Sequence, residues 1–126
     1  MRSRILRRAF LLAVLAGIFY LSHQPSLVIV PPLFPFQDKV LRAVEFFILG
    51  LSLLMNRDIC RGRCRLWILF SGGAVWAVLD EVHQSFIPGR DCSIMDLLAD
   101  LVGLCLCFSL LSRRKLPGNT VSAEDN

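Results

Sequence analysis

Two stretches of this 126-residue chain are apolar around the whole circumference of a helix. They read AFLLAVLAGIFYLS at 9–22 and LVGLCLCFSLL at 101–111. A helix on the surface of a soluble domain has one apolar stripe and one polar face, so these stretches need lipid or protein on every side. The chain as a whole is 55% hydrophobic with a mean hydropathy of +0.59, which is too apolar for an ordinary soluble domain of this size.

Four helical segments account for most of the chain. We predict them at 5–22, 38–55, 66–86 and 93–111. Each has the length, or nearly the length, needed to cross a hydrocarbon core about 30 Å thick. The connections between them are rich in proline, glycine or charge, which continue a helix poorly. The sequence therefore predicts an all-α integral membrane bundle of four transmembrane helices, one domain at 1–115, with a disordered cytoplasmic tail at 116–126.

Positive charge is distributed unevenly between the two ends of this bundle. Eleven of the fourteen Lys and Arg residues lie before the first segment or in its first turn, fill the second connection or follow the last segment. Because positively charged flanks stay on the cytoplasmic side, both termini are predicted to be cytoplasmic. Residues 1–22 also have the basic start and apolar middle of a cleaved signal peptide, but no small-x-small site follows the apolar run.

Three of the four segments carry polar residues along one face at 100° per residue. These residues are Asp38, Arg42, Glu45, Asp80, Glu81, His83, Gln84, Ser93, Asp96 and Asp100. Glu45, Asp80 and Asp100 lie about 9 to 10 Å from the outer ends of their helices at 1.5 Å per residue. An ionised group facing lipid costs about 2.5 to 3.5 kcal/mol. We therefore expect these side chains to face each other, or water, inside the bundle, in a pocket that opens outward.

Small residues with a spacing of four occur on two segments. The pairs are Gly73 with Ala77 and Ala99 with Gly103. This spacing is common where membrane helices approach closely. We interpret both pairs as packing contacts between helices.

Acids outnumber bases at the outer end. Seven carboxylates and three cations leave it short of about four positive charges if every group is ionised. Protons on carboxyl groups, a divalent cation or a cationic group of a ligand would each compensate. Asp38 and Asp91 are expected to be solvated at helix ends, and Ser93 is expected to cap the fourth helix.

The charged span at 80–96 resembles the signature of the VanZ-like family of bacterial membrane proteins. It reads Asp80-Glu81-x-x-Gln84-x-Phe86-x-Pro88-Gly89-Arg90-x-x-Ser93-x-x-Asp96, with Gly103 beyond it. Further matches are Ser22, Gln24-Pro25, Asp38-Lys39 and Leu49-Gly50, so the resemblance covers roughly residues 15 to 110. It implies a multi-pass protein of the bacterial plasma membrane with a role in the cell envelope. The family name comes from resistance to glycopeptide antibiotics of the teicoplanin type.

The chain departs from the family pattern at three positions. The family often has His, Tyr and Asn where this chain has Arg42, Phe46 and Asp100. Arginine does not titrate in a useful range, which argues against proton transfer at position 42. We hypothesise that Arg42 pairs with Asp100, an exchange that keeps the pocket balanced in charge.

The first hypothesis for function is that the pocket binds a lipid headgroup, a lipid-linked wall precursor or a glycopeptide. Arg90, on the turn after Gly89, is suited to donate two hydrogen bonds to a phosphate or carboxylate. The residues expected to form the ligand site are Arg42, Glu45, Asp80, Glu81, Gln84, Arg90, Asp96 and Asp100.

Two alternatives stay open. In a metal-dependent hydrolase of envelope phosphates or glycosidic linkages, a divalent cation would be held by Asp80, Glu81, His83, Asp96 and Asp100. An H-E-x-x-H motif is absent from the sequence. In a small proton-coupled carrier, Glu45 would carry the proton. The basic flanks are expected to meet anionic membrane lipid and no nucleic acid, because they lie beside membrane segments. The cofactor and the oligomeric state are left open.

Overall fold

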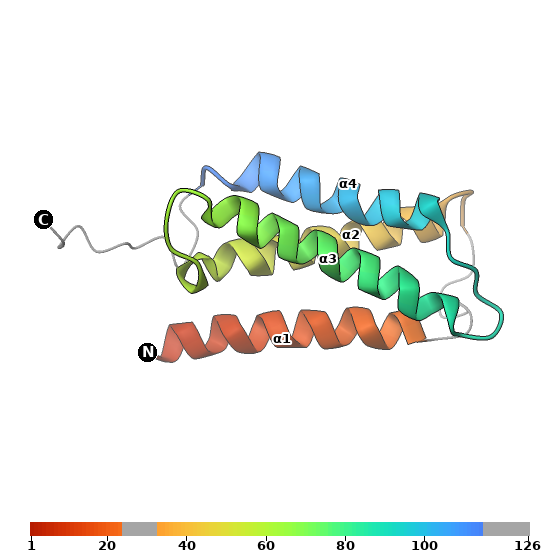
Figure 1. Cartoon of the computed structure of the whole chain (residues 1–126), viewed down its shortest axis with the longest axis horizontal. Helices are drawn as coiled ribbons and strands as arrows, with labels where there is room; N and C mark the ends of the chain where they lie inside the picture. The colour runs from red at the N-terminus through yellow and green to blue at the C-terminus, as the bar shows by residue number, and fades with distance from the viewer. Residues whose placement is uncertain (24–32, 115–126) are drawn as a thin grey trace, which may run out of the picture.

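The computed structural model describes residues 1–23 and 33–114, and within these ranges it is all-helical. Its elements are α1 (Arg2–His23), α2 (Gln37–Met55), the short 3-10 helix η1 (Arg57–Ile59), α3 (Arg65–Ser85) and α4 (Ile94–Leu111). The four long helices lie side by side along one axis (Figure 1). The predicted all-α class and its four helices are confirmed, and the ends differ from the prediction by three residues at most. The tail at 116–126 lies outside the described residues.

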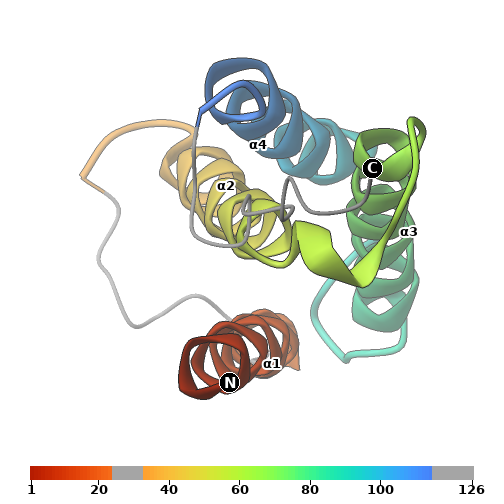
Figure 2. The same cartoon turned by 90° about the vertical axis from the view of Figure 1, so that its left-hand side faces the viewer.

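The core lies where all four helices meet. α2 contacts each of the other three helices, and the view along the bundle places it between α1 and α4 (Figure 2). One buried cluster joins Phe46 and Leu49 of α2 with Ile18, Ala77 and Leu104 from the other helices. Burial of these side chains supplies the apolar packing that sets the helices against each other.

Glycines allow α2 and α4 to approach closely. A Cβ atom added at Gly103 would clash with the carbonyl oxygen of Ala43 and lie 3.0 Å from its carbonyl carbon. A Cβ atom added at Gly50 would lie 2.9 Å from the Cβ atom of Cys107. The backbones themselves are therefore in contact here, as in small-residue interfaces of membrane helices.

The end of the bundle opposite the charged pocket is closed by two polar side chains of the α2–α3 connection. Asn56 donates from Nδ2 to the backbone carbonyl of Arg7 at 3.0 Å. Arg57 donates to the carbonyls of Leu54 at 3.1 Å and Leu111 at 3.2 Å. Because the last carbonyls of a helix have no partner within it, Arg57 satisfies acceptors at the ends of both α2 and α4.

Large apolar side chains cover the outside of the described helices. α1 buries only Ile18 and Ser22, and its exposed side chains include Phe10, Phe19 and Tyr20. Among the described residues, α1 and α4 are long and apolar enough to cross a membrane, with mean hydropathies of 1.8 and 2.1. An apolar exterior of this kind fits a protein whose solvent is lipid.

Candidate functional site

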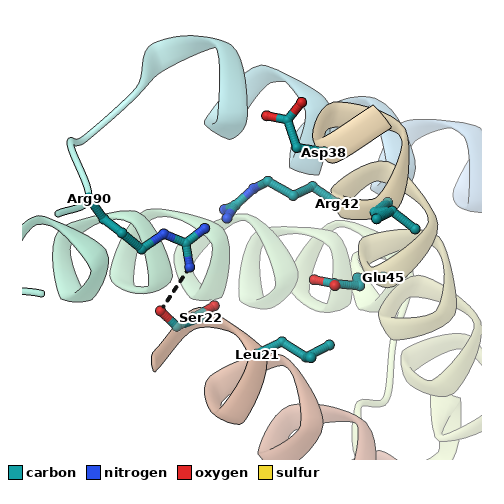
Figure 3. Close-up of a pocket in the computed structure, with 7 residues that line it drawn as sticks. Leu21, Ser22, Asp38, Arg42, Glu45 and Arg90 are labelled. Carbon is teal, nitrogen blue, oxygen red and sulfur yellow. Dashed lines mark hydrogen bonds between the residues drawn. The ribbon is translucent and has the colours of Figure 1, made fainter. Parts of the chain in front are cut away.

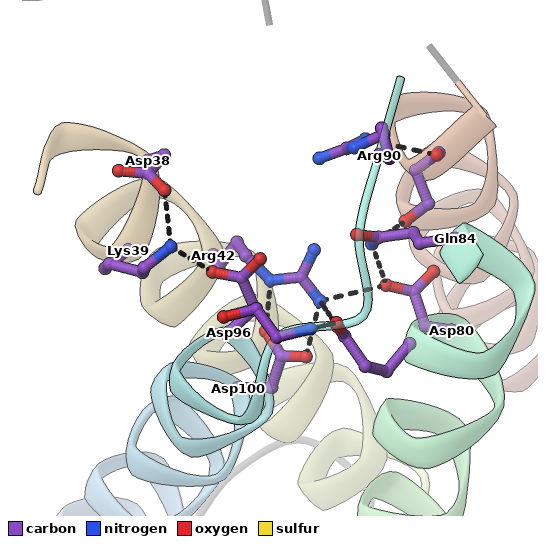
Figure 4. Close-up of polar contacts among 11 residues, drawn as sticks. Asp38, Lys39, Arg42, Asp80, Gln84, Arg90, Asp96 and Asp100 are labelled. Atoms are coloured by element: carbon purple, nitrogen blue, oxygen red, sulfur yellow. Dashed lines mark hydrogen bonds and ion pairs between the residues drawn. The ribbon is translucent and has the colours of Figure 1, made fainter. Parts of the chain in front are cut away.

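A buried arginine on α2 forms the centre of the polar region. Arg42 donates from Nε to Oδ1 of Asp100 at 3.0 Å and from Nη2 to Oδ2 of the same carboxylate at 2.7 Å. Figure 4 shows the two side chains facing each other between α2 and α4. The hypothesised pairing of Arg42 with Asp100 is therefore present, in the two-point geometry that makes arginine–carboxylate contacts strong.

Two further carboxylates meet the same guanidinium. Nη2 of Arg42 lies 3.2 Å from Oδ2 of Asp80 and 3.2 Å from Oε2 of Glu81, both on α3. The Arg42 side chain is 6% exposed, and those of Asp80, Glu81 and Asp100 are 3%, 4% and 0% exposed. When all four groups are ionised, one positive and three negative charges leave an excess of two negative charges. The polar faces of α2, α3 and α4 thus converge as predicted.

Gln84 connects this cluster to α1. Its Nε2 donates to Oδ2 of Asp80 at 2.9 Å, one turn away on α3, and lies 3.3 Å from Oγ of Ser22. Ser22 is one of the two buried residues of α1, the other being Ile18. The C-terminal end of α1 is therefore held to the charged cluster by hydrogen bonds as well as by apolar contact.

The start of α4 is capped from α3. The backbone N–H of Ser93 donates to Oε1 of Glu81 at 2.6 Å. Ser93 occupies the N-cap position as predicted, but its side chain makes no capping hydrogen bond. Glu81 accepts from the N–H of the N-cap residue itself, the contact that a Glu or Gln side chain makes in a capping box, and its negative charge lies near the positive end of the helix.

Asp96 belongs to a second group of charges. Lys39 forms an ion pair with Asp96 and another with Asp38, the latter at 2.7 Å between Nζ and Oδ2 (Figure 4). Asp38 lies in the first turn of α2 with its side chain 47% exposed, as expected for a solvated acid at a helix end, and it also pairs with Lys39. This group joins the first turns of α2 and α4 and lies beside the Arg42 cluster.

The Pro-Gly-Arg turn places Arg90 against α1. Gly89 has a φ of 83°, and the backbone N–H of Arg90 donates to the carbonyl of Ile87 at 3.2 Å. Proline followed by a glycine with positive φ is typical of a type II turn. Nη1 of Arg90 donates to the carbonyl of Ser22 at 3.2 Å, in the last turn of α1. The turn thereby covers the C-terminal end of α1.

A small pocket lies between α1, α2 and this turn. It measures about 250 Å³ including its open mouth, and it is lined by Leu21, Ser22, Asp38, Leu41, Arg42, Glu45 and Arg90. Figure 3 shows the guanidinium groups of Arg42 and Arg90 pointing toward each other and the Glu45 carboxylate below them. Glu45 was expected to face Asp80 and Asp100, or water, inside the bundle. It lies on the α1 side and makes no hydrogen bond with any described residue.

The eight predicted site residues thus divide into three groups. Asp80, Glu81 and Asp100 surround Arg42, and Gln84 is hydrogen-bonded to Asp80. Glu45 and Arg90 join Arg42 in the pocket, and Asp96 pairs with Lys39. Ser22 and Lys39 were not predicted as site residues. A buried serine at the end of an apolar helix is the signal that would have indicated Ser22.

The five side chains considered for a divalent cation do not converge. Asp80, Glu81 and Asp100 surround Arg42, whereas His83 lies against α1, with its Nε2 3.4 Å from Nδ1 of His23. Across residues 1–23 and 33–114, no group of three or more His, Cys, Asp or Glu side chains is arranged to hold a metal ion. The guanidinium is the positive group on which these carboxylates converge.

The fold and site define a small all-helical protein with an apolar exterior and a buried arginine–carboxylate cluster at one end. The profile of the VanZ/LLP1 family matches residues 8–115, which include most of α1, all of α2, α3 and α4, the Arg42 cluster and the Pro-Gly-Arg turn. The chain therefore belongs to the VanZ-like family, as the motif predicted. Neither the curated proteins nor the solved structures contain a match to it.

Proposed function

We propose that the chain crosses the bacterial plasma membrane four times with both termini in the cytoplasm. The basic residues before α1, between α2 and α3 and after α4 support this topology. Arg57 and Asn56 bind helix ends at that side of the bundle. The pocket between α1, α2 and the Pro-Gly-Arg turn then opens at the outer face.

The helices α2 and α3 have lower hydropathy over a membrane-spanning length than α1 and α4, and they fit this topology because their charged side chains point into the bundle. Arg42, Asp80 and Glu81 are buried. Val44 of α2 is 50% exposed and Val78 of α3 is 48% exposed, so both lie on the sides of these helices that face away from the bundle. A helix whose ionised groups are paired inside the bundle presents an apolar surface to lipid, and α2 and α3 meet this condition.

The outer pocket, on this proposal, binds the anionic group of an envelope ligand: a lipid headgroup, a lipid-linked wall precursor or a glycopeptide. The observation that carries the proposal is the pair of guanidinium groups, Arg42 and Arg90, in one pocket wall. Guanidinium matches the planar geometry of phosphate and carboxylate. Binding such a ligand would change its accessibility at the cell surface, and we propose a contribution to resistance against teicoplanin-type glycopeptides on this basis.

Replacing Arg90 with alanine is expected to reduce phospholipid binding by about tenfold or more, because a charge-assisted hydrogen bond contributes about 1.5 to 3 kcal/mol. Native mass spectrometry of the purified protein with bacterial phospholipids measures this binding. Cys92→Ala, at an exposed position of the same connection outside the pocket, is the matched control and should bind as the parent protein does. Unchanged lipid occupancy and unchanged teicoplanin susceptibility in the folded Arg90→Ala variant would contradict the proposal.

A further inference from the structure

The outer end retains negative charge after its ion pairs are counted. Six carboxylates belong to the two charged groups and the pocket, and only three cations lie among them; the acids are Asp38, Glu45, Asp80, Glu81, Asp96 and Asp100. A purely anionic ligand would increase this excess when it enters the pocket. A ligand that carries its own positive charge would reduce it.

Glu45 is the pocket acid that forms no ion pair among the described residues, although the charges of Arg42 and Arg90 act on it. Its side chain is half-buried and points into the pocket from α2, and it forms no hydrogen bond within residues 1–23 and 33–114. A carboxylate shielded from water needs a counter-charge or a donor. The pocket therefore offers an acceptor for a cationic group directly beside its arginines.

Arg42 presents a donor edge on the same side. Its Nε and Nη2 atoms are directed at the carboxylate cluster, and Nη1 makes no hydrogen bond with any residue of the described ranges. A guanidinium has five N–H donors, so Arg42 retains the capacity to bind an anion from the pocket while it is paired with Asp100. Donors and an acceptor for one ligand thus line a single pocket.

The chemistry and rim of the pocket restrict the ligand further. A primary ammonium has three N–H donors for the Glu45 carboxylate, whereas a trimethylammonium has none. Leu21 and Leu41 line the pocket beside the charged groups, and Leu41 is 37% exposed on the outside of α2. An acyl chain would find an apolar surface there, next to the headgroup position.

We propose that the ligand of this pocket is a zwitterion whose primary ammonium binds Glu45 and whose neighbouring phosphate or carboxylate binds Arg42 and Arg90. This inference rests on the proposed function of the pocket and specifies its ligand chemistry. A phosphoethanolamine headgroup has this arrangement in a lipid, and glycerophosphoethanolamine has it in a soluble molecule. The ammonium neutralises Glu45, and the anion uses the guanidinium edges, so both charges of the ligand are paired at once.

Competition between phospholipids tests the proposal. The full-length protein, in detergent, is given equimolar phosphatidylethanolamine, phosphatidylglycerol and phosphatidylcholine, and bound lipid is counted by native mass spectrometry. We expect phosphatidylethanolamine to be preferred about fivefold or more over each of the others. Glu45→Gln should remove this preference while the total lipid bound is retained. Asp91→Asn, which changes an exposed acid of the α3–α4 connection outside the pocket, should leave the preference unchanged.

The possible outcomes separate the inference from the proposed function. In one outcome lipid binding depends on Arg90 but shows no ethanolamine preference, and in another the preference survives Glu45→Gln. Either result overturns the proposal of a zwitterionic ligand and leaves the proposal of anion binding intact. Loss of any dependence on Arg90 overturns both. Displacement of the lipid by equal concentrations of glycerophosphoethanolamine assigns the site to a soluble zwitterion, and failure to displace it assigns the site to the lipid. If Mg²⁺ alone displaces the lipid and this displacement depends on Glu45, the proposed binding of an ammonium group to Glu45 is contradicted.

Discussion

Replacing Arg42 with leucine is expected to abolish accumulation of folded protein. The substitution leaves Asp80, Glu81 and Asp100 buried without their common donor, and removing one partner of a buried ion pair costs about 3 to 5 kcal/mol. This is a large part of the 5 to about 15 kcal/mol by which proteins of this size are stable. Fluorescence-detected size exclusion of the detergent extract should show the monodisperse peak lost, while Arg61→Leu, at an exposed site, should retain it.

The same contact predicts a specific rescue. Arg42→His and Asp100→Asn should each lower the melting temperature, because each leaves part of the two-point ion pair unmatched. Together they remove both charges of the pair and restore the residue types that the family often has. The loss of unfolding free energy in the double variant should therefore be smaller than the sum of the two single losses by about 1 kcal/mol or more. Additive losses would show that the Arg42–Asp100 contact has no stabilising role.

Replacing Gly103 with alanine is the second change for which we expect a large effect. The added Cβ atom would clash with the backbone carbonyl of Ala43, which cannot rotate away as a side chain would. Overpacking of this kind costs about 1 to 3 kcal/mol. A thermal melt of the purified protein should show the midpoint lowered by about 4 °C or more relative to the parent.

Gly72 provides the matched control for this prediction. It lies within α3, is exposed, and has no neighbouring atom within 4 Å of an added Cβ atom. Gly72→Ala should therefore keep or raise the melting temperature, because alanine favours the helix by up to about 1 kcal/mol. Equal melting temperatures for Gly103→Ala and Gly72→Ala would mean that α2 and α4 are not in backbone contact.

The helices were predictable because apolar runs and helix-breaking connections are local signals. The prediction of 38–55 against the observed α2 (Gln37–Met55) differs by one residue. The convergence of Arg42, Asp80 and Asp100 was also predictable. Buried charges must find partners, and the depth of each group follows from the helix rise. These inferences need only the sequence of each helix and the thickness of the membrane.

The lateral position of each side chain was less predictable. Glu45 follows Arg42 by three residues, which turns its side chain about 60° around the helix, away from α4 and toward α1. Glu45 therefore lies outside the Arg42 cluster, although its depth along the bundle is similar to that of Asp80 and Asp100. The cap of α4 was missed for a related reason: Glu81 and Ser93 are twelve residues apart, and only the packed bundle brings the carboxylate to that N–H.

Accessibility of the native cysteines tests the central claim, that the charged chamber opens to the outside of the cell. Cys92 is exposed beside the Pro-Gly-Arg turn, and Cys64 is exposed in the connection before α3. A membrane-impermeant maleimide, applied to cells whose plasma membrane is accessible and then mapped by mass spectrometry, should label Cys92 before lysis and Cys64 only after it. Labelling of Cys64 with protection of Cys92 in the intact cells would place the pocket in the cytoplasm and contradict the account.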